Sequence, residues 1–105
     1  MPVAPANIRK IAKNVLELRE TLPSSRKAGT PVGLARANQL ANGDNLSLQT
    51  LIRMRSYLIR ARANYRQAKA RGLDASNSKA IQAYELWGST PALRWANEQI
   101  KKLQG

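Results

Sequence analysis

The chain has 105 residues, of which 43% are apolar and only 5% aromatic, so it suits one modest helical core better than a β-sheet. Its 18 Lys and Arg residues against 6 Asp and Glu residues give a formal net charge of +12, which should attract polyanions, nucleic acid first among them. The absence of Cys and His excludes disulfides, thiolate metal sites and imidazole bases.

Apolar residues recur along the chain at spacings of three and four, which predicts amphipathic helices. Pro, Gly, Ser and Thr residues mark where each helix should begin and end. Counting their capping residues, we expect helices over residues 6–22, 30–41, 47–70, 79–87 and 90–103. Thr30, Ser47 and Thr90 would begin three of them, with Pro31 and Pro91 as first helical residues, and Gly43 would end the second. The apolar stripe of the last helix places Leu103 inward. We therefore predict an all-α fold, a single compact domain of four or five helices over residues 1–105. Residues 1–29 would form an N-terminal helix and a basic loop, and residues 30–105 would form the remaining helices as one module.

The two tryptophans lie on either side of the four-residue turn 88–91, in the stretch YELWGSTPALRWANEQI. A connection this short predicts a C-terminal helical hairpin. Trp87 and Trp95 would then fill the corner where the hairpin meets the rest of the domain, with Gly88 ending the first helix. Stacking of a nucleic-acid base on an exposed indole is the alternative interpretation.

The order of these segments resembles a small helical module of tailed-bacteriophage proteins, found with some prohead proteases and other head-associated proteins. The resemblance covers roughly residues 30–95 and rests on GTPVGLARANQLANGDNLSLQTLIRMRSYLIR followed by AYELWGSTPALRWA. Its most specific matches, to an L-W-G-G-x-x-G-x-x-W-A ending, are Leu86, Trp87, Gly88, Trp95 and Ala96. It implies a phage origin and a helical fold.

This sequence departs from the module in two places. Ser89 replaces the second Gly of the W-G-G step, and the later Gly corresponds to Ala92 or Leu93. The segment after Arg60 is rich in Arg, where the module carries acidic and His residues. The protease domain has no counterpart in this chain, so no catalytic residue carries over.

The residues offer little support for an enzyme, a metal site or a cofactor. Glu17 and Glu20 are three residues apart but sit among basic neighbours, as expected of a solvated helix face. The stretch Gly29–Gly33 is not followed by the Lys-Ser/Thr of a phosphate-binding loop, although Gly33 could approach a phosphate at a helix N-terminus. We therefore expect no catalytic residues, no metal and no cofactor.

The strongest functional signal is the helix expected over residues 47–70. Residues 46–75 hold seven basic side chains against one acidic side chain, Asp74. On a helical projection they form two basic ridges that flank the apolar stripe. Ridge A comprises Arg55, Arg62, Arg66 and Lys69, and ridge B comprises Arg53, Arg60 and Arg71. Arg suits planar contacts to phosphate, so the ridges predict polyanion binding; a solubilising face is the alternative.

The two helices around residues 42–46 also suggest a helix-turn-helix. In that motif Gln49 and Thr50, with Arg53, would stand where base edges are read. The turn is longer than the three or four residues usual for it.

We therefore expect a non-enzymatic, virion-associated or accessory phage protein that binds nucleic acid, DNA in preference to RNA, through phosphate contacts. The alternative is a phage structural or protein-interaction factor that docks on an acidic host or phage protein. Ile52, Tyr57 and Ile59, which lie off the main apolar stripe, would then be interface candidates. No uncharged run is longer than eight residues, and MPVAPANIRK lacks the apolar core of a signal peptide. The expected location is the host cytoplasm or the virion, with no membrane partner and no secretion.

Overall fold

A computed structural model describes residues 2–105 and confirms the all-α prediction. Within that range the regular structure is helical, apart from one isolated antiparallel bridge between Val3 and Asn45. The helices are α1 (Ala6–Thr21), the short 3-10 turn η1 (Ser24–Arg26), α2 (Pro31–Asn42), α3 (Leu48–Ala70), α4 (Lys79–Leu86) and α5 (Ser89–Gln104).

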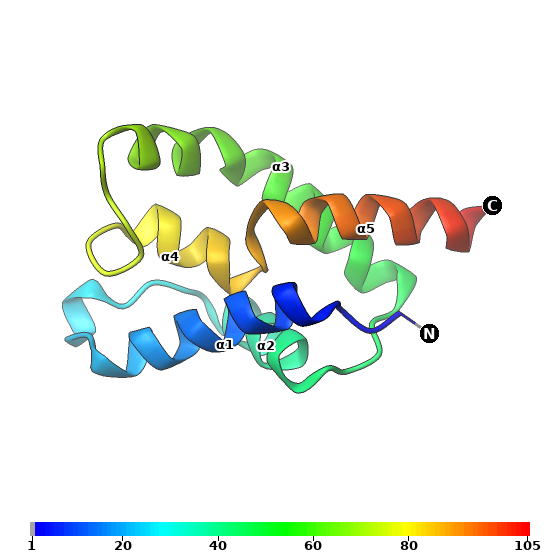
Figure 1. Ribbon diagram of the computed structural model, residues 1–105, viewed down its shortest axis with the longest axis horizontal. Helices are drawn as coiled ribbons and strands as arrows, with labels where there is room; N and C mark the ends of the chain where they lie inside the picture. Colours follow the sequence, from blue (N-terminus) through cyan, green and yellow to red (C-terminus); the bar gives the residue numbers. More distant parts are fainter. Residues whose placement is uncertain (1) are drawn as a thin grey trace.

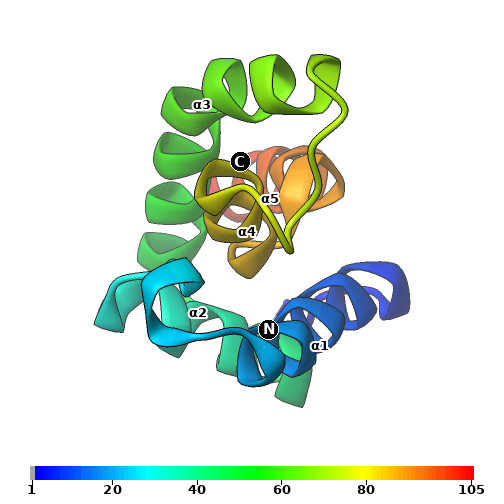
Figure 2. The same cartoon turned by 90° about the vertical axis from the view of Figure 1, so that its left-hand side faces the viewer.

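The helices stack in three layers (Figure 1). α1 and α2 pack together as one outer layer, α4 and the start of α5 form the middle, and α3 covers the other side. Figure 2 shows that α3 curves around the middle layer, and it contacts both α5 and α4. The radius of gyration of 13.2 Å agrees with the roughly 13 Å expected of a folded domain of this length. All five α-helices share one core cluster.

The helix starts follow the cap chemistry read from the sequence in three of the four internal cases. The side chains of Thr30, Ser47 and Ser78 accept hydrogen bonds from the backbone N–H groups three residues later. Each helix start therefore has a partner for one of the N–H groups that the helix itself leaves unbonded. Gly43 ends α2 in the left-handed conformation, as predicted.

The start of α5 differs from the prediction. The helix begins at Ser89 with Gly88 as its N-cap, so Thr90–Pro91 lies inside its first turn. Pro91 is tolerated there because N–H groups in a first turn have no partner within the helix. The Thr90 hydroxyl instead shares a hydrogen bond of 3.1 Å with the Tyr84 hydroxyl.

The predicted C-terminal hairpin takes the form of a bent pair of helices. Gly88 (φ +95°) and Ser89 (φ +62°) are both in the positive-φ region, and the chain changes direction between α4 and α5. Beyond the bend α5 packs mainly along α3 and not back along α4. Its last turn projects from the domain, which leaves Leu103 exposed although the apolar pattern placed it inward.

Both tryptophans belong to the core, as the corner interpretation predicted. Trp87 and Trp95 are each only 8% exposed and lie on either side of the bend. Gly88 is fully enclosed: a Cβ atom there would lie 2.5 Å from the Ala92 Cβ and 3.1 Å from the Ile8 Cγ2. The bend is therefore pressed directly against α1.

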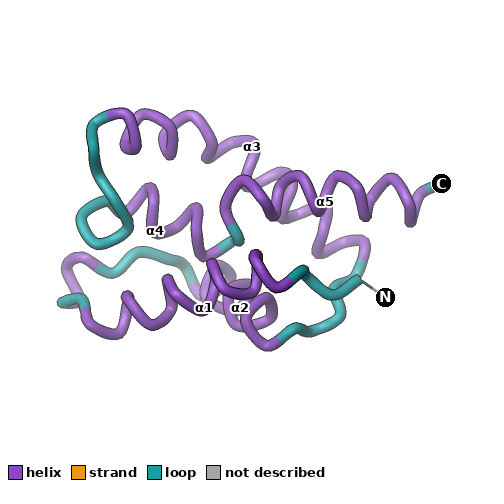
Figure 3. The backbone as a smooth tube through the Cα atoms, in the orientation of Figure 1, coloured by secondary structure: helices purple, strands orange, loops and turns teal. Residues whose placement is uncertain are grey.

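Gln82 holds two loops together from inside the core. These connections, residues 22–30 with the turn η1 inside them and residues 71–78, lie on the same side of the molecule in Figure 3. The Gln82 amide donates 3.1 Å hydrogen bonds to the carbonyls of Arg26 and Ala75, and its Oε1 accepts one of 2.7 Å from the Ala28 N–H. Every polar atom of this buried side chain is thus satisfied.

A comparison of two glycines should separate crowding from backbone strain at the bend. Gly72 has a similar φ of +80°, but a Cβ atom there meets nothing within 4 Å. Gly72→Ala should therefore cost only about 1–2 kcal/mol for the left-handed conformation. Gly88→Ala adds contacts with Ala92 and Ile8, so its midpoint of urea unfolding should fall clearly further. Equal losses for the two variants would show that the packing around Gly88 relaxes freely.

Candidate nucleic-acid interface

The predicted basic residues of α3 lie on the outside of the domain. All seven side chains of ridges A and B are at least partly accessible: Arg53, Arg60, Arg66, Lys69 and Arg71 are exposed, and Arg55 and Arg62 are half-buried. The inner face of the same helix buries Leu51, Met54, Leu58 and Ala68. The apolar stripe therefore anchors α3 while leaving the guanidinium groups available.

The C-terminal end of ridge A has acidic neighbours. Lys69 lies close enough to Asp74 and Glu85 for its charge to favour the ionised form of both carboxyls. The pKa of Asp74 is lowered, mainly by hydrogen bonds from the side chain and backbone of Ser76. Burial outweighs Lys69 at Glu85, whose pKa is raised. Lys69 is thus a weaker candidate for a phosphate contact than the arginines.

The arrangement of α2 and α3 does not match the close pair of a helix-turn-helix. α2 packs mainly on α1 and α4, whereas α3 packs mainly on α5 and α4. The connection between them is tied to the N-terminal segment, because the Leu46 N–H donates to the Pro2 carbonyl at 2.8 Å. The Thr50 hydroxyl is engaged with Ser47, so of the two base-reading candidates only Gln49 is freely exposed.

One basic residue that the sequence analysis did not single out is buried. Arg36 of α2 is only 7% exposed, and its guanidinium carbon lies 5.5 Å from the ring centroid of Trp87. Its Nη1 donates to the Gln39 side chain, while its Nε has no hydrogen-bond partner. Burial, followed by the charge of Arg53, lowers its pKa. Arg36 thus places a desolvated positive charge beside ridge B.

Trp87 joins three helices at this point. Its ring stacks on Tyr57 of α3, with centroids 4.5 Å apart and an interplanar angle of 17°. A Cβ atom on Gly33 would lie 3.3 Å from the indole Nε1, so this glycine makes room for Trp87. The Gly33 N–H donates to Thr30, which makes its role here structural.

A hollow of about 240 Å³ opens beside this aromatic pair. Its walls come from the start of α2, from α3 and from α4. They are formed by Gly29, Thr30, Tyr57, Ala83, Leu86 and Trp87. Burial raises the pKa of Tyr57, and the charge of nearby Arg60 acts in the opposite direction without cancelling it. Tyr57 and Ile52 were candidate interface residues for a protein partner, but both are only partly exposed and pack against the core.

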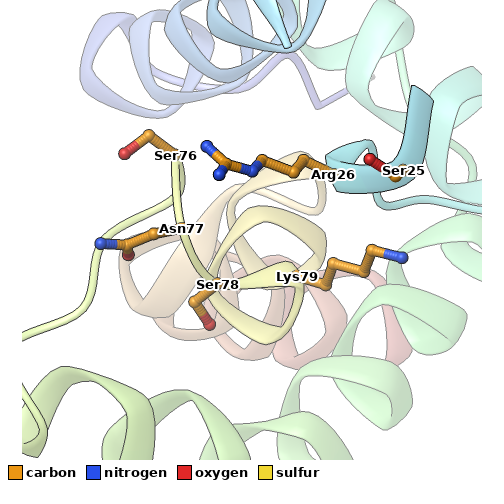
Figure 4. Close-up of a pocket in the computed structure, with 6 residues that line it drawn as sticks. All are labelled: Ser25, Arg26, Ser76, Asn77, Ser78 and Lys79. Carbon is orange, nitrogen blue, oxygen red and sulfur yellow. The ribbon is translucent and has the colours of Figure 1, made fainter. Parts of the chain in front are cut away.

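A second hollow, of about 270 Å³, lies between the two loops that Gln82 connects (Figure 4). Its cations do not converge: the Arg26 guanidinium extends toward Ser76, and the Lys79 ammonium extends the opposite way. The hydroxyls of Ser76 and Ser78 are occupied, by Asp74 and by the Ile81 N–H respectively. This hollow therefore lacks a set of free donors aimed at one point.

No group of three acidic side chains that could hold a metal ion occurs within residues 2–105. Over the same range no helix is both long enough and apolar enough to cross a membrane. Comparison with protein-family models, with curated proteins and with solved structures gave no match to this chain. The likeness to the phage module therefore stays a prediction from the residues that suggested it.

Replacing Trp87 tests its role as a structural junction. Trp87→Ala removes a nearly buried indole that contacts α2 and α3, so we expect a loss of about 3–5 kcal/mol in the free energy of unfolding. Urea unfolding followed by circular dichroism measures it. Trp87→Phe, which keeps an aromatic ring against Tyr57, should lose less. A loss below about 1 kcal/mol for the alanine variant would contradict this role.

Proposed function

We propose that this protein binds nucleic acid through phosphate contacts of ridges A and B on α3. The observation that carries the proposal is a row of seven basic side chains along α3 and its C-cap, five of them exposed and two half-buried, while the apolar stripe of the same helix is fixed in the core. A helix of 23 residues is roughly 35 Å long, similar to one turn of duplex DNA. The high share of arginine supports planar, bidentate contacts to phosphate oxygens.

This proposal involves no catalytic step, metal or cofactor. Phosphate contacts fix a protein on nucleic acid without reading its sequence, so the expected binding is weakly sequence-dependent. The resemblance to the phage module leads us to propose an accessory or virion-associated role for such binding, in the host cytoplasm or the virion. DNA is the first nucleic acid to test.

The salt dependence of duplex binding provides the test. Four or five phosphate contacts imply a slope of log K against log salt of about −4, at roughly −0.9 per contact. Arg62→Gln with Arg66→Gln should flatten this slope by about two units. Fluorescence anisotropy of a labelled duplex, titrated at several salt concentrations from about 50 to 200 mM, gives the slope.

The control variant is Lys10→Gln with Lys13→Gln, which removes the same charge from exposed positions on α1, in the opposite layer. It should keep most of the wild-type slope. Thermal unfolding of both double variants shows whether the fold is retained, because Arg62 is half-buried. Equal salt slopes for the two double variants would mean that the net positive charge of the protein, and not the surface of α3, attracts DNA.

The absence of any duplex binding at about 50 mM salt would remove the nucleic-acid proposal. Docking on an acidic protein surface would then be the leading candidate. Ile59, which is 49% exposed on α3, is the apolar side chain of that helix that such a partner could cover.

A further inference from the structure

The hollow beside Trp87 has walls suited to a flat, apolar ring. Tyr57 and Trp87 are stacked nearly parallel, and Leu86 and Ala83 complete an apolar surface. Its volume of about 240 Å³ is below the roughly 300–1,000 Å³ of pockets that bury drug-sized ligands. Such a space suits one ring system and excludes a larger molecule.

Positive charge lies near the two aromatic walls of this hollow, although no arginine is among the lining residues. On α3, Arg53 and Arg60 project within about 60° of Tyr57 around the helix axis. Arg36 approaches the same indole from α2, close enough to Arg53 for the two charges to interact. None of the six lining residues is acidic.

Arg36 is an unusual component of this arrangement. Buried cations in proteins are normally paired, yet Arg36 is nine-tenths buried, carries an unpartnered Nε and has a second arginine as its charged neighbour. An anion near Arg36 and Arg53 would remove the repulsion between them. Aromatic walls and neighbouring cations with no counter-charge are together the features that recognise a nucleotide, through its base and its phosphate respectively.

We infer that this hollow receives one unpaired base of a nucleic-acid strand, with the adjacent phosphates held by Arg53 and Arg60. The inference rests on the proposed function and gives it a preferred substrate, a single strand or an unpaired nucleotide. Bases within a duplex are stacked on one another and present only their edges, so they cannot enter the space between α2, α3 and α4. A base that enters would stack on the Tyr57–Trp87 pair.

The test compares three labelled DNA probes of equal length at one salt concentration: a single strand, the same strand with central abasic sites, and a duplex. The abasic strand keeps its phosphates and loses its bases. Base stacking on aromatic side chains corresponds to about 5- to 150-fold in affinity, so the intact strand should bind tighter than the abasic strand by at least that lower factor. Equal affinities would overturn the inference.

Filling the hollow tests the position of the base. Ala83→Leu adds a side chain at a lining residue, whereas Ala35→Leu adds the same group at an exposed position of α2 outside the hollow. Ala83→Leu should lose about 5-fold or more in affinity for the intact strand while its duplex binding and salt slope are unchanged. Ala35→Leu should bind all three probes as the wild type does. An equal change in affinity for the intact strand in the two variants would overturn the inference.

A second measurement covers the case in which Ala83→Leu does not fold. The variant Trp95→Phe leaves Trp87 as its one indole, so its fluorescence reports on the hollow. The intact strand should change this emission and the abasic strand should not. The same response to both strands would contradict base stacking there. If the wild-type protein did not bind the duplex, or bound it without the expected salt dependence, the proposed function itself would fail. Failure of the base-stacking inference leaves duplex binding intact, so the two failures are distinguishable.

Discussion

The whole arrangement depends on the bend at Gly88 and Ser89. Without it, residues 79–104 would form one continuous helix of roughly 39 Å, which could not place α4 against α1 and also lay α5 along α3. Two consecutive positive φ angles redirect the chain within two residues. Gly88 accepts this conformation readily, while for Ser89 the left-handed conformation costs about 1–2 kcal/mol. Packing around the buried bend must offset that strain.

Trp87 connects this bend to the basic surface. It ends α4, stacks on Tyr57 of α3 and fills the space that Gly33 leaves on α2. Arg53 and Arg60 are exposed and lie within about one turn of Tyr57 on α3. Residues that stabilise the core and residues that present positive charge therefore lie side by side on α3.

The sequence predicted those features that depend on neighbours in the chain. Thr30, Ser47 and Gly43 act as caps because capping involves residues within a single turn. The burial of Trp87 and Trp95 followed from the short turn between them, and the accessibility of the α3 arginines followed from periodicity. Thr90–Pro91 was misjudged because the same residues are acceptable within a first turn, and the choice of start was decided by the bend at Gly88.

Features that depend on tertiary partners were not predictable in this way. Gln82 reads as an ordinary polar position of an amphipathic helix, and only the folded chain brings the backbone of Arg26, Ala28 and Ala75 around its amide. Arg36 likewise occupies a helical position that is polar by pattern and buried in fact. Tyr57 lay off the apolar stripe, yet Trp87 from another helix covers it. The spacing of apolar residues shows which face of a helix is apolar. It does not show which side chains from other helices will pack on a given residue.

Arg36 is the residue whose presence the fold alone explains least. An apolar side chain such as Leu or Met at this position would pack on Trp87 without losing the hydration of a charge, and such replacements of buried charges are often neutral or stabilising. The guanidinium instead stays near a second arginine with its Nε unpartnered. A phosphate held by Arg53 would offset this unfavourable charge, because it would bring the missing counter-charge close to Arg36. Binding would then stabilise the folded domain at the point where Arg36 and Arg53 repel each other, and the gain would be greatest for a ligand that carries its phosphate next to a base.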